Sequence, residues 1–100
     1  MALDLGLGGK IAIISGGSEG LGRAAAERLA REGAKVTICA RRKDVLEAAA
    51  QGIRKATGGD VLAIPADATK AADIENVVRA TSEQWGGVDI LLNNAGTSAA

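Results

Sequence analysis

The regular alternation of short apolar runs with amphipathic stretches is the feature that most constrains the fold of this chain. Four of the runs are nearly continuous in Val, Ile and Leu, which is typical of strands buried on both faces of a sheet. These runs are Lys10–Ile14, Lys35–Ala40, Val61–Ile64 and Asp89–Asn93. Stretches with helical periodicity lie between them, at about Gly20–Glu32, Lys43–Ala56 and Ala72–Trp85. Strands that alternate with helices predict an α/β fold with a parallel sheet, right-handed crossovers and helices on both faces.

Each predicted helix has apolar residues spaced so that they share one face, and we expect these faces to pack against the sheet. In the first helix they are Leu21, Ala25 and Leu29. In the second they are Leu46, Ala49, Ala50 and Ile53, and in the third they are Ile74, Val77, Val78, Thr81 and Trp85.

Composition excludes several classes of function. Lys plus Arg is 12 and Asp plus Glu is 12, so charge gives no reason to expect nucleic acid or an anionic membrane as a partner. The single cysteine, Cys39, excludes an intramolecular disulfide and a Cys-rich metal site. Asp4 and scattered glycines interrupt the start where a signal peptide needs an apolar stretch, and no run approaches the ~18 residues of a membrane span. We therefore expect a soluble cytoplasmic protein without a metal.

The chain contains no His, Tyr or Phe. The usual proton-transfer residues are thereby reduced to Lys, Asp, Glu and one Cys. This composition suits a binding segment better than a complete catalytic site.

A glycine-rich segment joins the first predicted strand to the first predicted helix. It consists of Ser15, Gly16, Gly17, Ser18, Glu19, Gly20, Leu21 and Gly22. We expect Gly16, and with it Gly17, to take backbone angles closed to other residues, and Gly20 to leave space for a phosphate. Gly22 is small enough for the helix to pack closely on the strand. Backbone N–H groups at the helix start and the helix dipole would then favour the pyrophosphate of a dinucleotide.

Two other interpretations of this segment stay open. Its glycine spacing differs from the common dinucleotide fingerprint, and glycines in a strand-to-helix turn can be purely structural. The segment Gly17–Gly22 also matches the opening of a nucleoside triphosphate-binding loop. That loop continues with a lysine and a hydroxyl residue, whereas Arg23 and Ala24 follow here. The triphosphate interpretation is therefore the weaker one.

Basic residues follow the second predicted strand. An NAD site usually has an acid there for the ribose 2′-hydroxyl, whereas an Arg accommodates the 2′-phosphate of NADP. This chain has Arg41, Arg42 and Lys43, and the nearest acid is Asp44. The pattern favours NADP(H) over NAD(H), with Arg41 as the selecting residue and Arg42 beside it. The alternative for Arg42 and Lys43 is a solvated helix start.

An Asn-Asn-Ala-Gly segment, residues 93–96, ends the fourth predicted strand. In the doubly wound dinucleotide fold, the strand order 3-2-1-4 places the fourth strand beside the first. The loop after the fourth strand and the glycine-rich segment then flank the crevice in which such sheets bind ligands. Asn tolerates turn geometry and can satisfy loop backbone groups, so the segment taken alone could be an ordinary turn.

Together with Asp67 after the third strand, these segments resemble the classical short-chain dehydrogenase/reductase family. The resemblance runs from Lys10 to Gly96 and has the family's spacings. Where the family's glycine-rich pattern usually begins with Thr, Ser15 keeps the hydroxyl. The resemblance implies a Rossmann-type doubly wound parallel sheet, of which this chain carries the first four strands, in the order 3-2-1-4, and three helices.

The resemblance also implies roles for individual residues. Asp67 would accept a hydrogen bond from the adenine amino group, with the Ala68 backbone beside it, whereas the alternative for Asp67 is a loop cap. Arg41 matches the NADP-selecting position. Some NADP-dependent members have a basic residue where this chain has Glu19, which weakens that assignment.

The Asn-Asn-Ala-Gly segment has implied roles as well. Asn94, Ala95 and Gly96 would line the adenosine ribose, and Asn93 would brace the sheet. The family's catalytic Asn, Ser and Tyr-x-x-x-Lys pair all follow this segment, so we expect none of them within residues 1–100 and no catalysis by these residues alone.

We therefore expect residues 1–100 to be the N-terminal part of a single Rossmann dinucleotide-binding domain. The expected protein is an NADP(H)-dependent carbonyl reductase or alcohol dehydrogenase, similar to 3-oxoacyl reductases and acting on a small molecule. At full length it would be a homo-oligomer, a dimer or tetramer. The alternative is a non-catalytic dinucleotide-binding or regulatory module.

Overall fold

The predicted alternation of strands and helices is present in the computed structural model, which describes residues 6–94. In chain order the elements are β1 Ile11–Ser15, α1 Gly20–Arg31, β2 Lys35–Ala40, α2 Lys43–Thr57, β3 Val61–Pro65, α3 Ala71–Trp85 and β4 Ile90–Asn93. Every predicted element is confirmed, and no end differs from its prediction by more than one residue.

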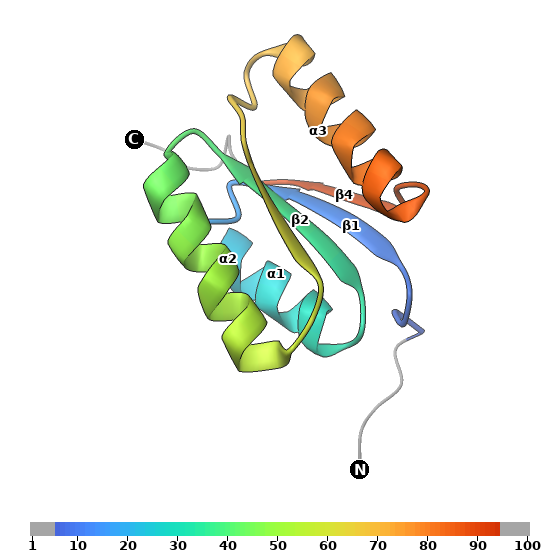
Figure 1. The fold of residues 1–100 in the computed structure, drawn as a ribbon. Coiled ribbons are helices and arrows are strands. Elements are labelled where there is room, and N and C mark those ends of the chain that lie inside the picture. Colours follow the sequence, from blue (N-terminus) through green and yellow to red (C-terminus); the bar gives the residue numbers. More distant parts are fainter. Residues whose placement is uncertain (1–5, 95–100) are drawn as a thin grey trace.

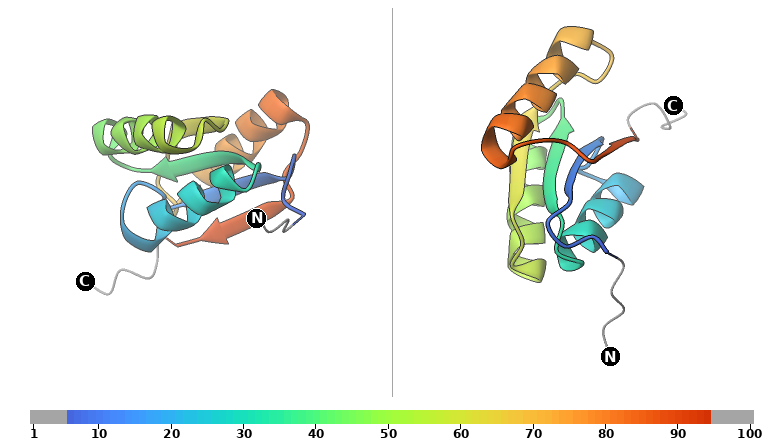
Figure 2. Two further views of the ribbon diagram at one scale, coloured as in Figure 1. Left: turned by 90° about the horizontal axis from the view of Figure 1, so that it is seen from below. Right: turned by 90° about the vertical axis from the view of Figure 1, so that its right-hand side faces the viewer.

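The strands form one parallel, four-stranded sheet in the order β3-β2-β1-β4, which confirms the predicted order. The chain moves across the sheet from β1 to β3 and then crosses back to place β4 on the other side of β1. Because such crossovers are right-handed, the reversal puts α1 and α2 on one face and α3 on the other (Figures 1 and 2).

Each face of the sheet has its own hydrophobic cluster. On the α1–α2 face, Val36 and Ile38 of β2 cluster with Leu46 of α2. On the α3 face, Ile13 of β1 clusters with Val77 of α3. Burial on both faces explains why the strands are continuous in apolar residues rather than alternating.

One polar pair lies inside the α3 face. Thr37 of β2 and Thr81 of α3 are both 0% exposed, and their hydroxyl oxygens lie 2.8 Å apart in a hydrogen bond. Each hydroxyl is therefore satisfied by the other, which offsets the cost of burying two polar groups.

The predicted packing face of helix α1 is confirmed in part, because Ala25 and Leu29 are partly buried against the core whereas Leu21 is not. Leu21 is 82% exposed, and the buried α1 residues are Gly22, Ala26 and Ala30. The predicted faces of the other helices are confirmed, because Leu46, Ala49, Ala50 and Ile53 are buried in α2, and Val77 and Thr81 in α3. The fully buried residues of α1 are thus small, Leu29 packs at their edge, and Leu21 is exposed.

Strand β4 forms one edge of the described sheet. Leu91 and Leu92 are 54% and 41% exposed. At the start of this strand, the Asp89 carboxylate accepts the Ile11 N–H at 2.9 Å, and the Asp89 N–H donates to the Ile11 carbonyl at 2.8 Å. Asp89 therefore joins β4 to β1 at the amino ends of the strands.

Candidate functional site

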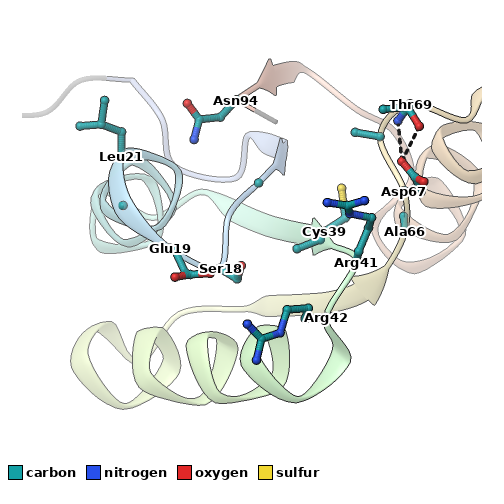
Figure 3. Close-up of a pocket in the computed structure, with 14 residues that line it drawn as sticks. Ser18, Glu19, Leu21, Cys39, Arg41, Arg42, Ala66, Asp67, Thr69 and Asn94 are labelled. Atoms are coloured by element: carbon teal, nitrogen blue, oxygen red, sulfur yellow. Dashed lines mark hydrogen bonds between the residues drawn. The ribbon is translucent and has the colours of Figure 1, made fainter. Parts of the chain in front are cut away.

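A pocket of about 530 Å³ opens at the carboxyl ends of the strands (Figure 3). It is lined by Gly16, Ser18, Glu19, Gly20, Leu21, Cys39, Ala40, Arg41, Arg42, Ala66, Asp67, Ala68, Thr69 and Asn94. The loops after β1, β2 and β3 contribute most of these residues, and Asn94 directly follows β4. Open α/β sheets bind ligands at this edge, so the fold brings the predicted segments together where a ligand site is expected.

The glycine-rich turn is attached to β2 by backbone hydrogen bonds. The N–H groups of Gly16 and Gly17 both donate to the Cys39 carbonyl oxygen, at 2.8 and 3.4 Å. Gly16 has a φ of +72°, as expected. The expectation for Gly17 is wrong, because its φ is not positive. A Cβ at Gly17 would lie 2.7 Å from Cγ2 of Ile38, so this glycine permits close contact with β2 instead.

Gly20 and Gly22 serve the turn in different ways. Gly20 has a φ of +58°, and a Cβ there would meet no protein atom within 4 Å, so the space beside it is open. A Cβ at Gly22 would collide with the Gly16 carbonyl oxygen and lie 2.9 Å from Nδ2 of Asn94. The close contact expected between Gly22 and the strand is therefore made with the turn and with the end of β4.

The amino terminus of α1 borders the pocket with backbone donors. The Arg23 N–H makes an early helical bond to the Glu19 carbonyl at 3.3 Å, and the N–H groups of Gly20, Leu21 and Gly22 precede it. Glu19 is the N-cap residue, and its side chain makes no capping hydrogen bond. Uncapped donors beside open space, together with the helix dipole, fit a pyrophosphate.

The wall after β2 is basic. Arg41 and Arg42 are exposed and line the pocket, and neither forms a salt bridge with another residue in the described range. Glu19, on the wall formed by the glycine-rich turn, is also exposed (Figure 3). An anion in this pocket would be attracted by both guanidinium groups and repelled by the Glu19 carboxylate.

Asp67 lies in the loop after β3 and acts as a loop cap through one oxygen. Its Oδ1 accepts the Thr69 hydroxyl at 2.6 Å and the Thr69 N–H at 2.9 Å (Figure 3). The hydroxyl bond first, then the N–H bond and the positive charges of Arg41 and Lys70, hold the pKa of Asp67 below its ordinary value. The carboxylate is therefore ionised at neutral pH. Within residues 6–94 its Oδ2 accepts no hydrogen bond.

Sequence reasoning did not place Cys39, Ala40, Ala66 and Thr69 in the site. The available signal was their position, since each lies within a few residues of the carboxyl end of a strand. Cys39 is 1% exposed, which confirms the prediction that it is a core residue. Burial raises the pKa of its thiol to about 11, so it is a neutral thiol at physiological pH.

Ser15, Gly17 and Gly22 belong to the predicted site but do not line the pocket. The Ser15 hydroxyl donates to Oδ1 of Asn93 at 2.8 Å, and Ser15 is 2% exposed. This bond joins β1 to β4, so Asn93 braces the sheet as expected. The Asn94 N–H donates to the Ser15 carbonyl at 3.2 Å. The predicted site residues Ala95 and Gly96 lie outside the described residues.

The pocket offers a ligand backbone donors on one wall, guanidinium groups on a second and a carboxylate on a third. Within residues 6–94, no three His, Cys, Asp or Glu side chains are grouped so that they could hold a metal ion. No helix in that range is long and apolar enough to cross a membrane.

Residues 10–100 match a family model described as short chain dehydrogenase. The 2,5-dichloro-2,5-cyclohexadiene-1,4-diol dehydrogenase LinX of Sphingobium indicum is 46% identical over 93 residues, which cover 90% of this chain and 36% of that protein. The rhamnolipids biosynthesis 3-oxoacyl-(acyl-carrier-protein) reductase of Pseudomonas aeruginosa is 44% identical over 92 residues, covering 92% and 35%. The chain thus spans about a third of the length of these relatives.

Among solved structures, the L-sorbose reductase of Gluconobacter frateurii, in complex with NADPH and L-sorbose, matches with a TM-score of 0.89 and 38% sequence identity. The match covers 98% of this chain and 40% of that one. The sheet described above therefore has the Rossmann-type fold of this reductase.

Proposed function

The chain belongs to the short chain dehydrogenase family, and from this premise we propose that it is the cofactor-binding part of an NADP(H)-dependent oxidoreductase. One observation carries the proposal. Backbone donors, basic side chains and a carboxylate surround a single space at the carboxyl edge of the sheet. These groups complement the pyrophosphate, the phosphorylated ribose and the adenine of NADP(H).

The residues that would hold the cofactor come from separate loops. The N–H groups of Gly20 and Leu21 would donate to the pyrophosphate, and Asp67 would accept a hydrogen bond from the adenine amino group through Oδ2. Ala68 would lie beside the adenine, and Asn94 would line the ribose. When bound, the nicotinamide would supply or accept a hydride in the interconversion of a carbonyl and an alcohol.

Arg41 is the residue proposed to select NADP(H). A 2′-phosphate adds up to about two negative charges, which a guanidinium can meet with a forked, charge-assisted contact. A hydrogen bond to a charged group contributes about 1.5–3 kcal/mol, which corresponds to roughly ten- to hundredfold in affinity. Arg42 adds a weaker contribution and Glu19 subtracts from it. The NADPH in the L-sorbose reductase structure supports this choice.

The rest of the proposal concerns the full-length protein. Its substrate is a small carbonyl compound or alcohol, in keeping with relatives described as a dehydrogenase and as a 3-oxoacyl reductase. We propose that it acts in the cytoplasm as a homo-oligomer.

The test compares the dissociation constants of NADP⁺ and NAD⁺ for the full-length protein at fixed salt. The parent should bind NADP⁺ roughly ten- to hundredfold more tightly. Arg41→Asp should reverse the preference, because Asp repels the phosphate and can accept a hydrogen bond from a 2′-hydroxyl. Arg79→Asp is a matched control, since Arg79 is an exposed arginine on α3 that lies outside the pocket and bonds to Asn76 at 2.7 Å. Equal binding by the parent, or an unchanged preference in Arg41→Asp, would contradict the proposal.

A non-catalytic dinucleotide-binding module is the second candidate. The described site supplies groups that would bind a dinucleotide and leaves this candidate open, and the lack of His and Tyr among these 100 residues is expected for both candidates. A Tyr-x-x-x-Lys pair in the full-length protein, together with NADPH oxidation in the presence of a ketone panel, would decide for the oxidoreductase. Tight NADPH binding without turnover of any carbonyl or alcohol would decide for the module.

A further inference from the structure

Asp73 connects helix α3 to the pocket loop. It is the third residue of α3, and its Oδ2 accepts the backbone N–H of Asp67 at 2.8 Å. The N-cap residue of the helix, Lys70, makes no side-chain capping bond. The Asp73 carboxylate thus bonds to a residue that precedes its own helix, Asp67, whose side chain lines the pocket.

The bond between Asp67 and Asp73 lies just beyond the last hydrogen bond between β3 and β2. The last bond of the β2–β3 ladder runs from the Ala66 N–H to the Ala40 carbonyl, at 2.9 Å. Asp67 follows directly, and α3 does not begin until Ala71. Its N–H therefore has no strand to bond to, and Asp73 supplies the acceptor instead.

The remaining polar groups of Asp67 are held by the loop itself. Its carbonyl accepts the Lys70 N–H at 3.0 Å, and its Oδ1 accepts the two Thr69 donors. Of the four polar groups of Asp67, only Oδ2 has no hydrogen bond within residues 6–94. The network thus leaves a single acceptor oxygen for a ligand, on a residue whose backbone and side chain are both fixed.

We propose that Asp73 is a positioning residue, which holds Asp67 so that its remaining carboxylate oxygen recognises the amino group of adenine. The inference rests on the proposed function, because it takes the ligand to be an adenine dinucleotide. Adenine donates from its amino group, whereas hypoxanthine has a carbonyl oxygen at the same ring position and cannot donate there. A fixed Asp67 carboxylate therefore discriminates between the two bases, and a loosened one does not.

The test measures the dissociation constants of NADPH and of deamino-NADPH, in which hypoxanthine replaces adenine, by titration of the full-length protein. The parent should bind NADPH at least about tenfold more tightly than deamino-NADPH, since one hydrogen bond to a charged acceptor is lost. Asp73→Ala removes the acceptor for the Asp67 N–H and should bring this ratio closer to one, although the Thr69 and Lys70 bonds remain. Asp73→Asn keeps an oxygen that can accept this N–H and should retain most of the ratio.

Asp89→Ala is the matched control. Asp89 also accepts a backbone N–H through its carboxylate, that of Ile11 at 2.9 Å, but at the opposite end of the sheet. This variant should lose thermal stability and keep the parent's base preference, which separates positioning from a general loss of structure.

A parent ratio near one would refute the adenine role of Asp67 within the proposed function, and the positioning role with it. A normal parent ratio that persists in Asp73→Ala, or that is lost in Asp73→Asn, would overturn the positioning role alone. If Asp73→Ala does not fold, Asp73→Leu replaces it as the variant without an acceptor and has the same expected and refuting results.

Discussion

Replacing Gly20 by Ala in the full-length protein should weaken cofactor binding while lowering stability only slightly. Gly20 has a φ of +58°, and this left-handed conformation costs a non-glycine residue about 1–2 kcal/mol. Part of the cost is offset, because Ala also restricts the unfolded chain by about 0.4–1 kcal/mol. The added methyl group would meet no protein atom within 4 Å, so no collision increases the loss. We expect the free energy of unfolding to fall by about 1 kcal/mol.

The expected loss of binding is larger. Gly20 lines the pocket at the amino terminus of α1, so its methyl group would stand in the space through which a phosphate reaches the backbone donors. Losing one hydrogen bond to a charged phosphate removes about 1.5–3 kcal/mol, which weakens binding at least about tenfold. Fluorescence titration with NADPH measures the binding, and urea denaturation measures the stability.

Gly58→Ala is the matched control for this substitution. Gly58 ends α2 with a φ of +71°, a Cβ there would also meet no protein atom within 4 Å, and it lies outside the pocket. This variant should lose the same stability and bind NADPH like the parent. Unchanged NADPH affinity in Gly20→Ala, or an equal loss of affinity in Gly58→Ala, would refute the reasoning.

Three further predictions concern two buried sites, the Thr37–Thr81 pair and Cys39, and the loop that holds Asp67. Thr37→Val or Thr81→Val alone should lower the free energy of unfolding by about 1–3 kcal/mol, because each leaves a buried hydroxyl unpaired, and the double variant should recover much of the loss in a denaturation series. Cys39 should resist iodoacetamide at pH 8 until the protein is unfolded, because burial raises its thiol pKa to about 11; rapid labelling of the folded protein would contradict this. Thr69→Val should raise the pKa of Asp67 toward its ordinary value, measured by carboxyl NMR. The pKa of Asp67 is lower in the folded than in the unfolded protein, so its charge stabilises the fold at neutral pH. This stabilisation is lost as the pH falls through the folded pKa. In Thr69→Val the loss should occur at a higher pH.

Helical periodicity predicted packing well where large side chains alternate with charged ones. In α2, Leu46 and Ile53 recur at helical spacing, and the charged residues Asp44, Glu47 and Arg54 fall on other faces, so only one face could be buried. In α1 the same reasoning was right for Ala25 and Leu29, which pack against the core, and wrong for Leu21; the fully buried residues there are small. Contact with the glycine-rich turn leaves no room for a larger side chain at Gly22, and this is a property of the assembled turn rather than of the periodicity.

In the candidate site, too, some features could be predicted from the sequence and others could not. Arg41 and Asp67 could be predicted because they lie one and two residues after the ends of β2 and β3, and the strand order brings those strand ends together. The bond from Asp73 could not be predicted, since it depends on how α3 is oriented after the loop. Likewise, the pairing of Thr37 with Thr81 depends on which α3 residue lies opposite β2.

The order of strands in the sheet also has a consequence during synthesis. The pairs β1–β2 and β2–β3 join residues roughly 25 positions apart, whereas the Ser15–Asn93 bond between β1 and β4 joins residues 78 positions apart. At about 5–20 residues per second, β4 leaves the ribosome several seconds after β2 is available to pair with β1. During that interval the second edge of β1 has no strand beside it and exposes unpaired backbone groups. A nascent chain is therefore open to mispairing and to capture by chaperones along β1, the strand that becomes the most deeply buried of the four in the finished sheet.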